Sequence, residues 1–539
     1  MKLLKFTLIF ALYNVIFTIP LLKNLANFDV GITYMLATIF CEFLIFSTLY
    51  SLLFWKRIQT NIFVYFFLIM NAFVFYFMSH FNTPINYDIF TNALQTNIEE
   101  VKDFLNFDMF FIVIIFGFVP CCAYYDFTKK VDIFDDDIKH LLMVKGIVVI
   151  VSIILILIMI FDNFKNFLVI RQNNELFDYL PPYNYIVGTI KTIKKSKKSK
   201  KKITTRIEKS QDDDEAMAVM DGKLKNISNG SAINLKTKNR NLIVYIVGES
   251  ERSKSISYNG YDKNTMKFLD KYRDNIVNFQ NFYSCNTSTF NSIPCMFTHS
   301  QKLDLDSMLE YENYVDIFKK LNFGLQWKTN NGGCKGVCGA ITDVGKVDGG
   351  DIELLGDLNK EISKLKADNN VIYLHFRGSH GTEYYKRYPD EFEYWKPACK
   401  EKELRKCDDE SIINAYDNSI RYTMFIVAKL IEILKANNDF NTGLVFVSDH
   451  GENIGENGFY LHGTPYILTK EVAGKVASFM WFNDNLLEEF KLNKQCMKNK
   501  ESGKFGHFNM FHTMLGLFRV NNAYYDEKMD IFKSCQLTQ

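Results

Sequence analysis

Five long apolar runs crowd the first 165 residues, and they constrain the fold of this chain more than any other feature. An α-helix needs roughly 20 apolar residues to cross a bilayer, and each run is close to that length. Buried core helices are the alternative, but five such runs in so short a segment leave too few polar residues for a soluble surface. The first run is also too long for a signal peptide and lacks a small-residue cleavage site. We therefore predict five membrane spans, at Leu3–Leu22, Val30–Phe54, Asn61–Phe81, Phe107–Tyr125 and Leu142–Phe161.

Basic residues in the short connections predict how these spans are oriented, because lysine and arginine concentrate in cytoplasmic loops. Lys23 and Lys102 fall on one side of the predicted spans. The other side holds Lys2, Lys5, Lys56, Arg57, Lys129, Lys130 and Lys139. With this larger group in the cytoplasm and an odd number of spans, everything after Phe161 lies outside. We expect a multi-pass protein of a bacterial inner membrane with its soluble part in the periplasm.

Two segments beside the spans are polar or amphipathic. The loop Asn82–Asn106 is longer than a connection needs, and Asn92 and Glu100 are among its polar residues. A solvated loop is the simpler interpretation of this composition, and a phospholipid headgroup site is the alternative. Residues 162–185 mix apolar with polar side chains, which predicts an interfacial helix that ends at Pro181-Pro182.

A charged linker follows the two prolines. Lys191–Lys202 contains eight lysines, Asp212–Glu215 is acidic, and the sequence to Asn239 is rich in Asn, Ser and Gly. Segments of this composition bury too little apolar surface to fold, so we predict a flexible linker. Contact between the lysines and anionic lipid headgroups is the alternative role.

From Asn241 onward, short apolar runs alternate with helix-like segments, which is typical of an α/β fold with a mainly parallel sheet and helices on both faces. We therefore expect a transmembrane domain over residues 1–161, an interfacial helix with the flexible linker over 162–240, and a periplasmic catalytic domain over 241–539. The net charge is only +2 and indicates no particular partner. We expect a monomer that binds no nucleic acid.

Eight of the eleven cysteines lie in the soluble half of the chain, and six of those eight form close pairs. Close pairs can bind zinc or form disulfides; no C-x-x-C spacing recurs here, so we favour disulfides. Disulfides need an oxidising compartment, which agrees with the periplasmic placement. Cys496 and Cys535 could form a fourth bridge or stay free. The close pairs are Cys285/Cys295, Cys334/Cys338 and Cys399/Cys407.

Three apolar runs in the soluble half, predicted as buried strands, each lead into residues that can bind metals. Open α/β sheets place their sites just beyond the carboxyl ends of the strands, so we expect these residues to share a crevice. Taken singly, an Asp-His pair is more often a hydrogen-bonded turn, and a lone histidine is more often structural. The runs are Leu242–Val247 before Glu249, Val371–Leu374 before His380, and Leu444–Val447 before Asp449 and His450, with His462 shortly after.

The short loop between Cys285 and Cys295 supplies a candidate nucleophile, Thr289. A disulfide across the loop would hold one of its hydroxyls at a fixed angle. A hydroxyl at its ordinary pKa is a poor nucleophile and needs a base or a metal beside it.

The strand-end residues can supply that metal. Glu249, Asp449 and His450 offer oxygen and nitrogen ligands suited to four-coordinate zinc. The fourth ligand would be Thr289 Oγ, or a phosphate oxygen on the modified threonine. His380 and His462 could hold a second metal or contact the transferred phosphate.

Several motifs then make the chain recognisable. It resembles the phosphoethanolamine transferases, the family of the lipid A modifying and mobile colistin resistance enzymes, within the alkaline phosphatase superfamily. The resemblance spans nearly the whole chain. The motifs are V-G-E-S at Val247–Ser250, S-C-N-T-S-T-x-x-S-I-P-C-M-F at Ser284–Phe297, G-S-H-G at Gly378–Gly381, N-A-Y-D-N-S-I at Asn414–Ile420, S-D-H-G-E-N-I-G-E-N-G at Ser448–Gly458 and F-H-T-M-L-G-L-F at Phe511–Phe518.

The resemblance implies roles for individual residues. Thr289 is the expected phosphoethanolamine acceptor, and the spacing of Asn92 and Glu100 matches the family's headgroup loop, which favours that interpretation over a solvated loop. Asn331 and Lys335 are the expected substrate-handling residues. The implied zinc ligands are Glu249, Thr289, Asp449 and His450, and the implied second-metal or phosphate contacts are His380 and His462.

The resemblance also implies a reaction. One tightly bound Zn²⁺, with room for a second, would support transfer of phosphoethanolamine from phosphatidylethanolamine onto Thr289, with release of diacylglycerol. The group would then pass to lipid A or another envelope acceptor. Thr382 departs from the family pattern, where proline is expected after Ser-His-Gly, and Cys334 and Cys338 flank Lys335. These departures leave the choice among lipid A phosphate, core sugar, glycan and surface protein open.

Three other functions fit parts of the sequence. A glycerophosphotransferase of the lipoteichoic acid synthase type would share the spans, the metal set and the threonine, but the cysteine pairs argue against it. A sulfatase needs C/S-x-P-x-R, and the sequence Ser292–Met296 has no arginine at the required position. A non-enzymatic membrane sensor would have no use for metal ligands beside a clamped threonine.

Overall fold

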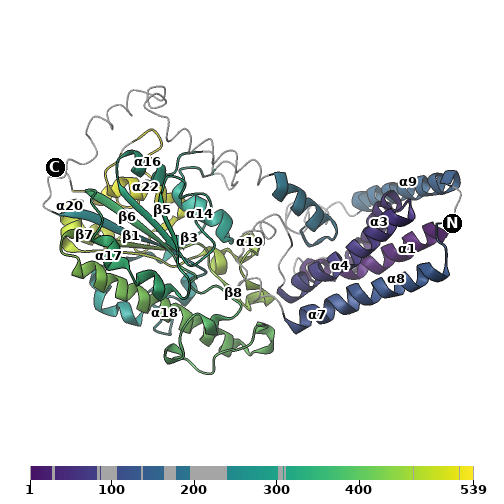
Figure 1. Ribbon diagram of the computed structural model, residues 1–539, viewed down its shortest axis with the longest axis horizontal. Coiled ribbons are helices and arrows are strands. Elements are labelled where there is room, and N and C mark those ends of the chain that lie inside the picture. Colours follow the sequence, from purple (N-terminus) through teal and green to yellow (C-terminus); the bar gives the residue numbers. More distant parts are fainter. Residues whose placement is uncertain are drawn as a thin grey trace. The chain divides into compact units, whose positions relative to one another are not determined.

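The computed structural model describes residues 2–26, 31–81, 85, 106–134, 138–162, 178–194, 239–301, 308, 311–464, 466–520 and 522–537. These residues fall into two compact units, a helical unit up to Thr192 and a unit from Ile193 onward that contains the sheet (Figure 1). The fold class is the one predicted from the sequence.

Within the described part of the helical unit, five stretches are long and apolar enough to cross a membrane, as predicted. The apolar side chains of the last stretch, such as Ile150 and Leu157, are largely exposed, as expected for a helix that faces lipid. The first and fourth stretches each join several helical pieces. The helices are α1 (Lys2–Asn14), η1 (Val15–Thr18), α2 (Ile19–Ala26), α3 (Ile32–Leu53), α4 (Arg57–Phe81), α7 (Phe107–Val113), η2 (Ile114–Phe118), α8 (Val119–Lys130) and α9 (Ile138–Asp162).

A buried polar network ties three parts of the helical unit together. Asn71 of α4 donates from Nδ2 to Asn14 Oδ1 of α1 at 2.5 Å. Its own Oδ1 accepts a hydrogen bond of 2.8 Å from the hydroxyl of Tyr185. Polar groups within a bilayer must find partners inside the protein, so this network fixes the segment around Tyr185 against the bundle.

The segment after Pro181 and Pro182 is a helix, because residues 183–194 are helical. Proline is well suited to the start of a helix, since it lacks an N–H that would otherwise be unpaired there. Lys191 and Lys194, which the sequence assigned to the flexible linker, therefore belong to a helix. The interfacial helix predicted before the prolines falls largely on residues 163–177, outside the described residues, as does most of the charged linker.

The second unit is built on a seven-stranded sheet in the order β2-β10-β7-β1-β6-β4-β5 (Figure 1). The strands β7, β1, β6, β4 and β5 run parallel, whereas β10 is antiparallel to both β7 and β2. The mainly parallel sheet expected from the sequence is therefore present. The strands are β1 (Arg240–Gly248), β2 (Ile276–Asn278), β4 (Gly324–Thr329), β5 (Asp343–Lys346), β6 (Asn369–His375), β7 (Phe440–Ser448) and β10 (Ser478–Phe482).

Helices cover both faces of this sheet, with α14, α16 and α22 on one face and α17 and α18 on the other (Figure 1). The central strands are buried on both faces, which explains their near-continuous apolar sequence. The helices are α14 (Thr289–Phe297), α16 (Tyr314–Lys320), α17 (Leu358–Ile362), α18 (Asp409–Ala436), α19 (Tyr466–Thr469), α20 (Asp484–Glu489), α21 (Lys494–Lys498) and α22 (His507–Leu517). Two small ribbons pair β3 (Asn281–Tyr283) with β11 (Lys504–Gly506) and β8 (Asn453–Ile454) with β9 (Tyr460–Leu461).

An aromatic cluster anchors the carboxyl end of α14 on the sheet. The ring of Phe297 stacks on that of Tyr314 at 5.0 Å and lies 5.6 Å from Tyr245 and 5.7 Å from Tyr373. Aromatic pairs at such distances add to the free energy gained from burying the rings. With its last residue fixed in the core, α14 presents its first residue, Thr289, at the carboxyl ends of the strands.

Candidate active site

The carboxyl ends of β1 and β7 bring three predicted metal ligands together. Gly248 and Ser448 pair in the parallel register of these strands. Glu249 follows the first strand, and Asp449 and His450 follow the second. Each side chain offers one ligand atom, and these three atoms lie within 4.8 Å of one another. All three residues are fully buried.

Thr289 lies against this group. Its hydroxyl donates to Glu249 Oε2 at 3.2 Å and lies 3.1 Å from His450 Nε2. It begins α14, where the unpaired backbone N–H groups of a helix N-terminus favour negative charge. The predicted nucleophile and the predicted ligands therefore meet at one point, although 40 residues separate Thr289 from Glu249 and 161 separate it from His450.

The imidazole of His450 is oriented for metal binding. Its Nδ1 lies 3.1 Å from the carbonyl oxygen of Gly451, which can only accept, so Nδ1 carries the proton. The bare Nε2 then faces Glu249 Oε1 at 3.3 Å and Asp449 Oδ2 at 3.2 Å. Three acceptor atoms at such distances repel one another unless a proton or a cation lies between them.

The pKa values of these groups reflect the same crowding. Burial, together with the neighbouring Asp449, raises the pKa of Glu249 to about 7. Burial also raises the pKa of Asp449 to about 6 and lowers that of His450 to about 4. Buried carboxylates with raised pKa values hold protons in the absence of a cation, and a bound cation replaces those protons.

A second group lies beside the first. The ring of His462 is 4.4 Å from that of His450 and 4.9 Å from that of His380. Ligand atoms of Glu249, His380 and His462 also come within 4.8 Å of one another. The structure thus places both predicted second-site histidines next to the Glu249–Asp449–His450 group.

Glu452 sets the charge of His462, a role that the sequence did not reveal. Its Oε2 lies 3.1 Å from His462 Nδ1, and its Oε1 accepts from the hydroxyl of Tyr384 at 3.0 Å. Burial alone would lower the pKa of His462, but the charge and hydrogen bond of Glu452, together with the charges of Glu249 and Asp449, outweigh it and raise the pKa to about 9. In the sequence, the one sign of this role was the position of Glu452, three residues after Asp449. By contrast, burial and the nearby His462 hold the pKa of His380 well below its ordinary value.

Asn331 lies within the site, in contact with a carboxylate. Its Nδ2 donates to Glu249 Oε2 at 2.8 Å and to the carbonyl oxygen of Phe376 at 3.1 Å. Lys335, the other predicted substrate-handling residue, is half-buried in the next turn of the same loop. Burial, together with the charge of Lys335, lowers the pKa of the nearby His375 to about 3.

Close backbone approach requires glycine at Gly378 in the G-S-H-G motif. This residue has φ +50°, and a Cβ atom there would come 2.6 Å from the carbonyl oxygen of Glu249 and 2.6 Å from Glu251 Oε1. Two neighbouring carboxyls are also held in place: Glu251 accepts from Ser448 Oγ at 2.9 Å, and Asp351 accepts from the Gly378 N–H at 2.9 Å.

All eight cysteines of the soluble half form disulfides. The structure pairs Cys285 with Cys295, Cys334 with Cys338, Cys399 with Cys407, and Cys496 with Cys535. The fourth bridge resolves the alternative that the sequence left open.

The loop that carries Thr289 is further fixed by His507. Its Nε2 donates to the carbonyl oxygen of Ser448 at 3.0 Å, and its Nδ1 accepts from the Cys285 N–H at 3.4 Å. Asn92 and Glu100 lie outside the described residues.

Comparison with known proteins decides which family this geometry belongs to. The family model described as "Sulfatase" matches residues 241–520, and the model described as "Phosphoethanolamine transferase EptA/EptB" matches residues 42–197. The phosphoethanolamine transferase EptA of Escherichia coli K12 is 32% identical over 408 residues, which cover 73% of this chain and 71% of the relative. The chain belongs to the phosphoethanolamine transferase family.

Two solved structures have a similar fold. The integral membrane lipooligosaccharide phosphoethanolamine transferase A of Neisseria meningitidis superposes with a TM-score of 0.84 at 23% identity, over 98% of each chain. The C-terminal periplasmic domain of phosphoethanolamine transferase EptC from Campylobacter jejuni is 39% identical, with a TM-score of 0.50, over 54% of this chain and 94% of that domain. The transferase is therefore an integral membrane protein with a soluble periplasmic domain.

Proposed function

We propose that this transferase moves phosphoethanolamine from phosphatidylethanolamine to lipid A, or to another glycan or protein of the cell envelope, with Thr289 as the covalent carrier. Zinc is the proposed cofactor, and the bacterial inner membrane is the proposed location. The observation that supports this proposal best is the position of Thr289 Oγ1, within 3.2 Å of both Glu249 and His450 at the N-terminus of a helix.

The residues present fit a zinc ion. Asp449 Oδ2 is buried and has no hydrogen-bond partner among the described residues, although it faces Glu249 and His450. Two carboxylates, one neutral imidazole nitrogen and one hydroxyl form the oxygen and nitrogen set that zinc binds with four ligands. When bound, zinc supplies Lewis acidity that lowers the pKa of a coordinated hydroxyl and stabilises charge on phosphoryl oxygens.

In the first step, Thr289 Oγ1 attacks the phosphorus of phosphatidylethanolamine. A bond forms between Oγ1 and phosphorus as the Thr289 hydroxyl passes its proton to Glu249 Oε2, which already accepts its hydrogen bond at 3.2 Å. The bond from phosphorus to the diacylglycerol oxygen breaks, and that oxygen takes up a proton. His462 is placed to supply the proton, because its Nδ1 lies 3.1 Å from Glu452 Oε2 and the charge of that carboxylate favours the protonated ring. The products are diacylglycerol and phosphoethanolamine bound to Thr289.

In the second step, an oxygen of the acceptor attacks the same phosphorus. The bond from Oγ1 to phosphorus breaks, Thr289 recovers its hydroxyl, and any proton lost by an acceptor hydroxyl returns to the site. The dipole of α14 favours the negative charge that forms on the phosphoryl oxygens in both steps. A threonine that is regenerated in this way makes the reaction a ping-pong exchange between two envelope molecules.

Intact-protein mass spectrometry tests this proposal. Purified full-length enzyme incubated with phosphatidylethanolamine and no acceptor should gain about 123 Da, the mass of one phosphoethanolamine group. Thr289→Val, which keeps the shape of the side chain, should gain nothing, whereas Thr289→Ser should still be labelled. Labelling of Thr289→Val at the wild-type level would show that the nucleophile is another residue.

The same measurement separates the two alternative reactions. A glycerophosphotransferase would add a glycerophosphate of about 154 Da when supplied with phosphatidylglycerol. The sulfatase model matches the catalytic domain, but sulfatase chemistry requires an arginine that Ser292–Met296 lacks. Neither alternative predicts an adduct that forms from phosphatidylethanolamine and is lost from Thr289→Val.

A further inference from the structure

Thr287 is a second threonine in the loop that carries the nucleophile, and no step of the proposed reaction uses it. It lies two residues before Thr289, in the sequence C-N-T-S-T that begins at Cys285. Its side chain is 3% exposed, so its hydroxyl is withdrawn from solvent. A buried hydroxyl must find a partner within the protein, and the identity of that partner indicates what the residue does.

The partner of Thr287 is the loop that carries His462. Thr287 Oγ1 donates to the carbonyl oxygen of Thr464 at 2.6 Å. In the opposite direction, the Gly463 N–H donates to the carbonyl oxygen of Thr287 at 2.7 Å. The two hydrogen bonds form a two-way bridge between loops that are far apart in the sequence. The bridge lies close to Thr289 on one loop and close to His462 on the other.

The loop around His462 has a backbone that needs such support. Leu461 and Gly463, on either side of His462, have φ of +64° and +77°. Left-handed backbone is unfavourable for a leucine, so contacts with other residues have to maintain it. Asn453 supplies one contact from within the β8–β9 ribbon, since its Nδ2 donates to the carbonyl oxygen of Leu461 at 2.7 Å. The bridge to Thr287 supplies another, from the loop that carries the nucleophile.

Glu452 fixes a different property of His462. Its Oε2 lies 3.1 Å from His462 Nδ1, so it holds the charge and the orientation of the ring. Glu452 and His462 belong to the same segment, however, and a contact between them does not fix their distance from Thr289. The ring of His462 lies 4.4 Å from that of His450, whose Nε2 is 3.1 Å from Thr289 Oγ1. Displacement of a group this close to a reacting atom by about 1 Å can cost about 100-fold in rate.

We propose that Thr287 is a positioning residue, whose hydroxyl keeps His462 at the distance from Thr289 that the first step requires. The proposal rests on the proposed function, because the bridge has this purpose only if His462 acts in the transfer to Thr289. It extends that function to a residue that has no contact with the reacting atoms. Since Thr287 acts through His462, removing its hydroxyl should matter only while His462 is present.

A double-mutant cycle tests this dependence. Full-length enzyme is mixed with phosphatidylethanolamine, quenched at successive times and analysed by intact-protein mass spectrometry for the rate of adduct formation at Thr289. Thr287→Val keeps the shape of the side chain but cannot donate, and should lower this rate about tenfold or more. His462→Gln should lower it roughly 100-fold or more, and Thr287→Val should lower it no further in the His462→Gln background. Thr287→Ser keeps the donor and should react at nearly the wild-type rate.

Ser292→Ala is the matched control. The Ser292 hydroxyl also donates to a backbone carbonyl, at 2.8 Å, but the acceptor is Asn286, within the same loop. Any loss of rate in Ser292→Ala should therefore have the same size with and without His462. The proposal is overturned if Thr287→Val has the wild-type rate. It is also overturned if Thr287→Val lowers the rate by the same factor in both backgrounds, which would mean that Thr287 only holds its own loop.

Hydrogen exchange gives a readout that needs no turnover. The Gly463 amide is protected by its bond to Thr287, so peptides that contain it should exchange about two- to tenfold faster in Thr287→Val and at the wild-type rate in Ser292→Ala. If exchange changes in this way but wild-type enzyme gains no adduct, the bridge between the loops stands and the proposed reaction fails. If the adduct forms but Thr287→Val has wild-type exchange and rate, the reaction stands and Thr287 has no positioning role.

Discussion

Asn331 and Thr289 donate hydrogen bonds to the same oxygen, Glu249 Oε2, at 2.8 Å and 3.2 Å. The sequence assigned Asn331 to substrate handling, but this contact makes it a residue that orients a proposed metal ligand. Partners of this kind fix the direction in which a carboxylate presents its lone pairs, and losing one typically costs 10–100-fold in metal affinity or activity.

Asn331→Ala should therefore lower kcat and weaken zinc binding, each by roughly 10–100-fold, while the KM for the donor stays near the wild-type value. The reason is that the side chain acts on Glu249 and not on the lipid. Steady-state kinetics and a zinc titration against a competing chelator provide the measurements. A raised KM with unchanged kcat and zinc affinity would instead support the substrate-handling role.

Substitution of Gly378 should disrupt the site through a steric clash with the backbone of Glu249. Gly378→Ala should lower the free energy of unfolding by about 3 kcal/mol or more, because the added Cβ meets two oxygens at 2.6 Å. Gly260→Ala is the matched control, since Gly260 also has a positive φ, at +93°, but has open space around its Cβ position. It should lose only about 1–2 kcal/mol. Equal losses in chemical denaturation would show that backbone strain alone explains the requirement for glycine.

Much of this architecture could be predicted because its signals are local. Each span is a continuous apolar run, and the central strands run directly into Glu249 or Asp449. Because β1 and β7 are parallel neighbours, the residues that follow them lie side by side, and the sequence of the two strands is enough to predict this. The loop between Cys285 and Cys295 could be proposed as the source of the nucleophile because it is short and rich in hydroxyls, and the family resemblance then indicated Thr289 among them.

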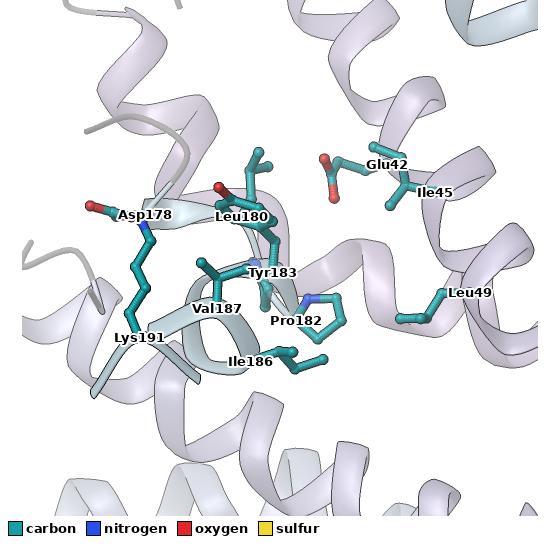
Figure 2. Close-up of a pocket in the computed structure, with 11 residues that line it drawn as sticks. Glu42, Ile45, Leu49, Asp178, Leu180, Pro182, Tyr183, Ile186, Val187 and Lys191 are labelled. Carbon is teal, nitrogen blue, oxygen red and sulfur yellow. The ribbon is translucent and has the colours of Figure 1, made fainter. Parts of the chain in front are cut away.

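The remaining features depend on contacts that the sequence does not display. His507 lies 222 residues from Cys285, and nothing near it marks it as a support for the Thr289 loop. Helix 183–194 could not be predicted from the sequence, because its lysines, Lys191 and Lys194, are continuous with the lysine-rich run that follows. Glu42 is one acid in a long apolar run, and the sequence does not show that it lines a cavity between α3 and residues 178–191 (Figure 2).

The metal site should be sensitive to pH in the neutral range. Zinc binds the deprotonated carboxylates, and the pKa values of Glu249 and Asp449 in the metal-free protein are raised to about 7 and about 6. Zinc affinity should therefore rise by about tenfold per pH unit between pH 6 and 7 and level off above that. His450, with a pKa lowered to about 4, releases no proton in this range. An affinity that is constant from pH 5 to 8 would contradict this expectation.

The same shifts predict how the stability of the metal-free protein changes with pH. Both carboxyls have folded-state pKa values above their ordinary ones, so the folded state binds more protons than the unfolded state between about pH 4 and 7. The contribution of these groups to stability is therefore lost as pH rises through that range. Thermal unfolding with and without zinc should show a stabilisation by zinc that grows from pH 5 to about pH 7 and then levels off. Glu249→Gln should reduce this growth.

The disulfide Cys285–Cys295 should matter for catalysis as well as for stability. In the chain-entropy account, removing a bridge with a sequence separation of 10 costs about 3 kcal/mol, and removing Cys399–Cys407, with a separation of 8, costs nearly the same. The paired Cys→Ser variants should therefore lose similar stability. Only the first should lose the Thr289 adduct in mass spectrometry at a temperature where both are folded, because only that bridge fixes the nucleophile. Equal adduct formation in both would assign the first bridge a purely structural role.

The pairing of His462 with Glu452 should set the alkaline limit of the reaction. In the proposed first step, protonated His462 supplies the proton that diacylglycerol takes up, so kcat should fall at alkaline pH as His462, whose pKa Glu452 raises, loses its proton. Glu452→Gln removes the largest of the charges that raise this pKa and leaves burial, which lowers it, opposed only by Glu249 and Asp449, so the alkaline limb should move by about one pH unit or more toward neutral pH. Tyr384→Phe removes the other contact of the Glu452 carboxyl, at 3.0 Å, without changing its charge, and should leave the limb near its wild-type position. If the two variants have the same pH profile, His462 is not the proton donor, and its role is confined to holding a metal or the transferred phosphate.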